Sequence, residues 1–138
     1  MLFRSQPAGV NPVGAAEGAY LQAAVDLEHQ HSSAALKAYD AAVKRWPNSL
    51  AAWMGLGNIR YALADISGAA KAFEQANTIH PDAAEPLNNL AQVRLQQGEF
   101  DAAIEAIEKA LQLDQNSELY QQTRREIMRL SNMARDRS

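Results

Sequence analysis

The chain has 138 residues, the length of a single domain, and 47% of them are hydrophobic, enough for a core that needs no disulfide or metal. It has no cysteine, which excludes a disulfide framework, a thiolate metal site and a cysteine nucleophile. Residues 1–123 carry 8 basic and 14 acidic side chains, whereas residues 124–138 carry 5 arginines and 2 acidic side chains. Nucleic-acid binding needs a clustered cationic surface, so the acidic body argues against a nucleic-acid partner.

The first 14 residues are predicted to be an extension or linker. They lack the apolar stretch of a signal peptide, and no run in the chain approaches the ~18 apolar residues of a membrane span. We therefore expect a soluble protein that does not insert into membranes, and the sequence does not indicate its compartment. Residues 2–5, LFRS, match the translated end of a common sequencing adaptor, so we hypothesise that the N-terminus is truncated.

Apolar residues at helical spacing, separated by short turns, predict seven helices. They are expected at about 15–29, 33–46, 49–63, 66–79, 83–97, 100–113 and 117–133. Cap residues are expected at Ser49, at Asp82 with Glu85, and at Ser117, while Gly98 is placed to end the fifth helix.

The sequence repeats with a period of thirty-four residues. Residues 50–81 align with residues 84–115 without a gap, and large residues match large ones while small residues match small ones. A third copy precedes them, so the repeats span about 16–49, 50–83 and 84–117, within a domain at 15–134 that is followed by a tail at 135–138. The aligned pairs that carry this result are Trp53 with Leu87, Leu56 with Leu90, Gly57 with Ala91, Arg60 with Arg94, Tyr39 with Phe73, Phe73 with Ile107 and Pro47 with Pro81.

This pattern resembles the tetratricopeptide repeat family. The resemblance lies in Trp53, Leu56, Gly57, Ala69, Phe73, Ala76 and Pro81 and covers about residues 15–115. It implies an all-α fold, a right-handed α-solenoid of three helix hairpins closed by a C-terminal capping helix. Arg60 and Arg94 stand where the family has a tyrosine, and because the change recurs after one period we interpret it as altered packing between repeats.

Two glycines lie inside the third predicted helix, where each costs about 1 kcal/mol relative to alanine. We interpret Gly57 as a spacer that lets paired helices approach, so that Phe73 and Tyr39 pack closely. Gly55 lies on another face, where it is either merely tolerated or leaves room for a ligand.

The last helix carries an apolar stripe of Leu119, Thr123, Ile127 and Leu130 among arginines. Such a helix is typical of the cap that covers the end of a repeat array. An alternative is that Met128 and Met133, together with Ile127, dock a partner or form a homodimer.

No arrangement of residues indicates catalysis, a metal or a cofactor. His29 and His31 point in different directions on a helix, and His80 stands alone before a proline. Glu105 and Glu108 lie on an outward helix face with no pocket to raise a pKa. We therefore expect that this chain is not an enzyme.

The resemblance implies that the first helix of each hairpin lines a concave groove that holds a peptide or protein segment. We predict an unidentified protein or peptide as partner, bound by amide and apolar side chains. Family members that clamp the terminal carboxylate of chaperones use cations here, and these cations are absent, which argues against that ligand. The predicted lining is Leu21, Val25, Met54, Asn58, Tyr61, Asn88, Asn89, Gln92 and Gln96.

A looser resemblance suggests a different role. The runs AAEGAYLQAA, LAAWMGLGN and LNNLAQV are similar to the repeat part of bacterial proteins that begin with a C39-like, papain-type cysteine peptidase domain. This implies a second hypothesis, a C-terminal accessory domain of an enzyme whose catalytic domain lies upstream. Structural self-association through the last helix is a third.

Overall fold

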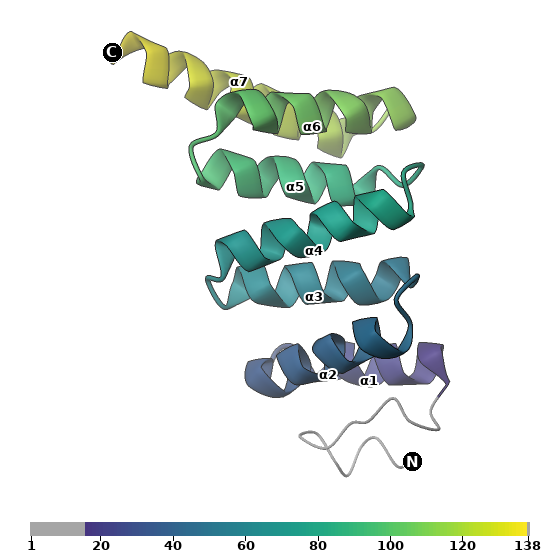
Figure 1. Cartoon of the computed structure of the whole chain (residues 1–138). Coiled ribbons are helices and arrows are strands. Elements are labelled where there is room, and N and C mark those ends of the chain that lie inside the picture. Colours follow the sequence, from purple (N-terminus) through teal and green to yellow (C-terminus); the bar gives the residue numbers. More distant parts are fainter. Residues whose placement is uncertain (1–15, 138) are drawn as a thin grey trace. The chain divides into compact units, whose positions relative to one another are not determined.

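The computed structural model describes residues 16–137, which form seven α-helices and no strand (Figure 1). Every predicted helix is present, although α7 continues past residue 133. The N-terminal extension and the hypothesis of a truncated N-terminus lie outside the described residues. The helices are α1 Glu17–Leu27, α2 Ser32–Arg45, α3 Leu50–Ala62, α4 Ile66–Ile79, α5 Glu85–Gln96, α6 Phe100–Leu113 and α7 Glu118–Asp136.

Serine side chains begin two of these helices as predicted. The Ser49 Oγ accepts a hydrogen bond from the Ala52 amide at 3.1 Å, and the Ser117 Oγ accepts one from the Tyr120 amide at 3.2 Å. The prediction of an Asp82 cap is wrong, because the N-cap residue before α5 is Ala84, and no side chain caps this end of the helix. Pro86 lies in the first turn of α5, where the missing amide proton costs no helical bond.

Two helices end in residues with left-handed backbone. Gly98 follows α5 with φ 76°, and its amide donates to the Leu95 carbonyl at 3.0 Å, so the predicted end is confirmed. Ala64, one period earlier, follows α3 with φ 66°, and its amide donates to the Tyr61 carbonyl at 3.0 Å. The same turn is thus made once with glycine and once with a residue whose Cβ is strained there.

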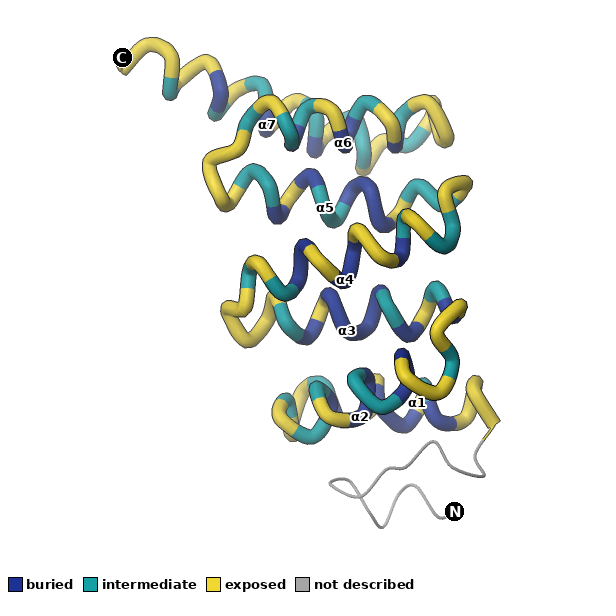
Figure 2. The backbone as a smooth tube through the Cα atoms, viewed as in Figure 1, coloured by how far each residue is buried: buried dark blue, intermediate teal, exposed yellow. Residues whose placement is uncertain are grey.

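The described residues divide into two compact units, 16–72 (unit 1) and 73–137 (unit 2), with the boundary inside α4. In unit 1, α2 packs against α1 and α3, and α1 also contacts α3. The buried residues of these helices recur at helical spacing (Figure 2). Its core consists of Tyr20, Ala24, Leu27, Ala35, Ala38, Tyr39, Ala42, Val43, Ala52, Leu56, Ile59 and Ala72.

In unit 2, α6 packs against α5 and α7, and α7 also contacts α5. Three of the four alanines of α6, Ala103, Ala106 and Ala110, lie on its buried side, which allows the helices to approach closely. The core of this unit consists of Leu87, Ala91, Ala103, Ala106, Ile107, Ala110 and Ile127.

The interpretation of Gly55 as tolerated, or as room for a ligand, is wrong. Gly55 is buried, and a Cβ added to it would overlap three atoms of the Tyr39 ring. The space is therefore taken by the chain's own aromatic side chain. Gly57 is buried as well, and its proposed role beside Phe73 stays a prediction.

The buried stripe of α7 differs from the predicted one. Thr123, Ile127 and Ser131 are buried, whereas Leu119 is 56% exposed. Ile127 is fully buried in the core of unit 2, so it is not available to a second copy. The helix therefore caps unit 2 through a narrower and more polar face than its leucines suggest.

Candidate functional site

The predicted lining of unit 1 lies on two helices that contact each other, α1 and α3. On α1, Leu21 is half-buried and Val25 is 43% exposed. On α3, Asn58 is exposed and Tyr61 is 41% exposed, but Met54 is only 6% exposed. Four of these five residues are therefore accessible to a ligand, and Met54 supports them from below.

The predicted lining of unit 2 lies on α5. Gln92 and Gln96 are exposed, Asn89 is half-buried, and Asn88 is buried at 3% exposure. No lysine or arginine occurs among the nine predicted lining residues. The accessible chemistry is that of amides in unit 2, and of amide, aliphatic and aromatic groups in unit 1.

Asn88 carries an unsatisfied polar atom. Its Oδ1 is buried and has no hydrogen-bond partner among the described residues. A buried acceptor without a partner costs about 1–3 kcal/mol, which makes it an uncommon feature in a folded chain. Because this atom is buried, a ligand N–H group would reach it only after a rotation of the Asn88 side chain toward the surface.

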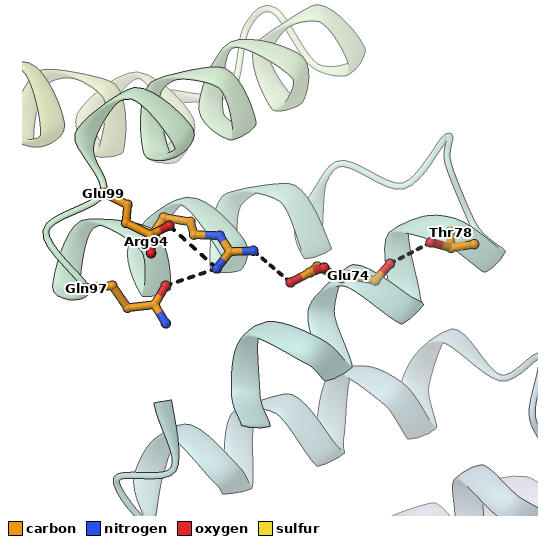
Figure 3. Close-up of polar contacts among 5 residues, drawn as sticks. All are labelled: Glu74, Thr78, Arg94, Gln97 and Glu99. Carbon is orange, nitrogen blue, oxygen red and sulfur yellow. Dashed lines mark hydrogen bonds and ion pairs between the residues drawn. The ribbon is translucent and has the colours of Figure 1, made fainter. Parts of the chain in front are cut away.

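Arg60 and Arg94, which occupy corresponding positions of successive repeats, each reach back to the preceding repeat. The Arg94 Nη2 lies 2.7 Å from the Glu74 Oε1 on α4, and its Nη1 lies 3.8 Å from Glu99 (Figure 3). The Arg60 Nη2 lies 3.9 Å from the Asp40 Oδ1 on α2. Both ion pairs join one repeat to the next, while the interpretation of altered packing between repeats stays a prediction.

In a third ion pair, the acidic residue again lies one period of thirty-four residues after the preceding one. Glu108 lies thirty-four residues after Glu74, and its Oε1 accepts a hydrogen bond from the Arg124 Nε at 3.0 Å. The acids Asp40, Glu74 and Glu108 were missed as a set by sequence reasoning. Their constant spacing in the printed sequence is the signal that could have found them.

Tyr39 forms a short polar contact in unit 1. Its hydroxyl donates a 2.5 Å hydrogen bond to the Glu28 Oε1 at the end of α1. Burial, and secondarily the bond to the Glu28 carboxylate, hold the pKa of Tyr39 well above its usual range. The phenol therefore stays protonated and joins α1 to α2.

The histidines and carboxylates do not converge on a site. His29 and His31 are exposed at the turn between α1 and α2, and Glu105 pairs with Lys109 at 3.2 Å. Within residues 16–137, no three histidine, aspartate or glutamate side chains gather as a metal ion would require. Nor does any helix of that range have the length and apolar character needed to cross a bilayer.

Comparison with sequence models of known families gives two matches, both to the same family. Two sequence models, both described as tetratricopeptide repeat, match residues 20–84 and 61–127, and together they cover three pairs of helices. No curated protein sequence matches the chain.

Solved structures with similar folds cover most of the chain. The first tetratricopeptide domain of Spaghetti (RPAP3), bound to the HSP90 peptide SRMEEVD, has a TM-score of 0.78 at 13% identity over 84% of this chain and 93% of its own. The Sgt2 domain from Aspergillus fumigatus has a TM-score of 0.81 at 18% identity over 94% and 87%. MamA has a TM-score of 0.77 at 19% identity over 95% and 73%. The predicted all-α fold is confirmed.

Proposed function

Because this chain is a member of the tetratricopeptide repeat family, we propose that it is a non-catalytic interaction module that binds an extended peptide segment along the first helices of its hairpins. The family is one of protein-interaction modules, and one similar structure was solved with a peptide bound. The finer proposal concerns which side chains bind the peptide and what kind of peptide they accept.

The proposed contacts divide by chemistry. The amides Asn58, Gln92 and Gln96 would bond the peptide backbone, because an amide side chain both donates and accepts hydrogen bonds. Val25 and Tyr61 on adjacent helices would hold an apolar side chain. The expected ligand is an uncharged, extended segment with at least one apolar residue.

The observation that carries the proposal is the unpartnered Oδ1 of Asn88. Retaining this acceptor in the free chain costs stability, whereas a bound peptide N–H would satisfy it once the buried Asn88 side chain had rotated toward the surface. This predicts opposite effects of one substitution. Replacing Asn88 with leucine should stabilise the free chain by about 1 kcal/mol and weaken peptide binding.

The test combines a peptide array with thermal unfolding. Binding of apolar peptides should be lost in Asn58→Ala with Asn88→Ala, and in Asn88→Leu, while the melting temperature of Asn88→Leu rises. Arg129→Ala is the matched control, because Arg129 lies on α7 and pairs with Glu126. Equal binding by the parent chain and both lining variants would exclude the proposed contacts.

The peptide SRMEEVD serves as a negative probe. Its acidic residues need cations, and the lining residues include none. Tight binding of SRMEEVD to the parent chain would contradict the proposed preference for uncharged segments.

A further inference from the structure

Three methionines lie in the described part of the chain, and they differ in how far solvent reaches them. Met54 on α3 is buried at 6% exposure, Met128 on α7 is half-buried, and Met133 on α7 is 40% exposed. Peroxides oxidise a methionine most readily where solvent reaches its side chain. Met133 is therefore the methionine of the described residues that reacts first.

The Met133 sulfur already faces a hydrogen-bond donor. Arg129 lies one helical turn earlier on α7, and its Nη1 donates to the Met133 Sδ at 3.3 Å. A thioether sulfur is only a weak acceptor, so this contact adds little while the methionine is reduced. A stronger acceptor at the same place would gain a full hydrogen bond from a cation.

Glu126 holds the Arg129 guanidinium in place on α7. The Arg129 Nε donates to the Glu126 Oε2 at 3.1 Å, and the Nη2 donates to the Glu126 Oε1 at 2.7 Å. These two bonds form a fork between guanidinium and carboxylate, and they leave Nη1 for the sulfur. The donor is therefore oriented before any chemical change at Met133.

We propose that Met133 is a site of oxidation to methionine sulfoxide by a peroxide, and that Arg129 binds the sulfoxide oxygen. The sulfur lone pair attacks one peroxide oxygen and the O–O bond breaks, so that sulfur loses two electrons and the peroxide gains them. With hydrogen peroxide, the proton of the transferred oxygen moves to the leaving oxygen, which departs as water.

The product differs from the reduced side chain in one polar contact. The sulfoxide oxygen is a stronger acceptor than the sulfur, so the contact with Arg129 becomes a charge-assisted hydrogen bond. A sulfoxide in a core disrupts packing, whereas at the exposed Met133 it adds a bond that stabilises the end of α7. The site lies outside the predicted peptide lining and does not depend on the proposed function.

The first test measures which methionine reacts. The full chain is treated with hydrogen peroxide, and mass spectrometry of its peptides follows sulfoxide formation at Met54, Met128 and Met133 over time. Met133 should react at least about fivefold faster than Met54, with Met128 between them. Equal rates at Met133 and Met54 would overturn the assignment of the site.

The second test measures whether Arg129 binds the sulfoxide. Amide hydrogen exchange is compared in the last two turns of α7 before and after oxidation of the full chain. Oxidation should slow this exchange about twofold, the effect of one added side-chain pair at i, i+4. In Arg129→Ala, oxidation should leave the exchange unchanged or speed it. An oxidised parent chain that exchanges no more slowly than the reduced one would disprove the bond.

Two further variants separate Met133 from the other methionines. Met133→Leu should show no change at the end of α7 after the same peroxide treatment. Met133→Gln places an amide oxygen near Arg129 and should slow the exchange without peroxide. If Met133→Gln exchanged at the same rate as Met133→Leu, this result would contradict Arg129 as the partner.

Discussion

Gly55 lies where any side chain would collide with the Tyr39 ring. The glycine costs helix propensity within α3, but it allows the aromatic ring of α2 to lie against the helix backbone. We expect Gly55→Ala to destabilise the chain by about 1–3 kcal/mol, the usual range for overpacking. Urea unfolding measures this change.

The control for this substitution is Gly18→Ala in α1. A Cβ at Gly18 would have nothing within 4 Å, so alanine should leave stability unchanged or raise it by up to about 1 kcal/mol. If Gly55→Ala proved as stable as the parent chain, this result would contradict the close contact between the Tyr39 ring and the backbone at Gly55.

Tyr39 also links stability to pH. Its pKa is raised in the folded chain above the usual value of about 10, mainly by burial and then by Glu28. A raised folded pKa gives stability that is fully present below about pH 10 and is lost as the pH rises toward the folded pKa. The free energy of unfolding should therefore fall more steeply above about pH 10 in the parent chain than in Tyr39→Phe.

Urea unfolding at pH 8 and pH 11 compares the two slopes. Tyr20 and Tyr120 also have pKa values raised by burial and are present in both proteins, so some loss is expected in each. If the free energy of unfolding fell equally in both proteins between pH 8 and pH 11, ionisation of Tyr39 would not contribute to the alkaline loss of stability.

At the scale of the element, α3 and α5 end in the same left-handed turn. The turn is made by different residues that lie one period apart in the sequence. Ala64 has φ 66° and Gly98 has φ 76°. Left-handed backbone destabilises the folded state by about 1–2 kcal/mol for a residue with a Cβ. Glycine avoids this strain, but its greater freedom in the unfolded chain offsets about 0.4–1 kcal/mol of the gain. Ala64→Gly should therefore stabilise the chain by about 0.5–1 kcal/mol, and Gly98→Ala should destabilise it by a similar amount.

Thermal unfolding of the two variants and their combination measures the turn energies. The effects should nearly cancel in the double variant, since the sites lie in different helix ends. A loss of stability in Ala64→Gly would contradict the left-handed assignment at this turn.

At the scale of the whole molecule, the acids Asp40, Glu74 and Glu108 follow the period of the repeat, each facing an arginine of the next helix. A double-mutant cycle of Glu74→Gln and Arg94→Met should give a coupling energy of about 0.2–1 kcal/mol, because the acid is half-exposed. The Asp40 and Arg60 pair, separated by 3.9 Å, should couple more weakly. Equal coupling energies in the two pairs would show that the distance between acid and arginine does not determine the coupling energy.

The period of thirty-four residues allowed most of this fold to be predicted from the sequence, because it indicates which positions are buried in each repeat. Leu87 in place of Trp53 and the acids at constant spacing could be read in the same way. Gly55 could not, since spacing along α3 does not tell how far the Tyr39 ring turns toward it. The burial of Asn88 and Ser131 could not be predicted either, because asparagine and serine are mostly exposed in folded proteins.

Both tryptophans of the chain, Trp46 and Trp53, belong to unit 1. Intrinsic fluorescence during denaturation consequently reports on the first half of the repeat array, whereas far-ultraviolet circular dichroism averages over all seven helices. If the molecule melts as one cooperative body, the two optical transitions coincide. A separation between them would resolve the order in which its halves come apart, with no label needed.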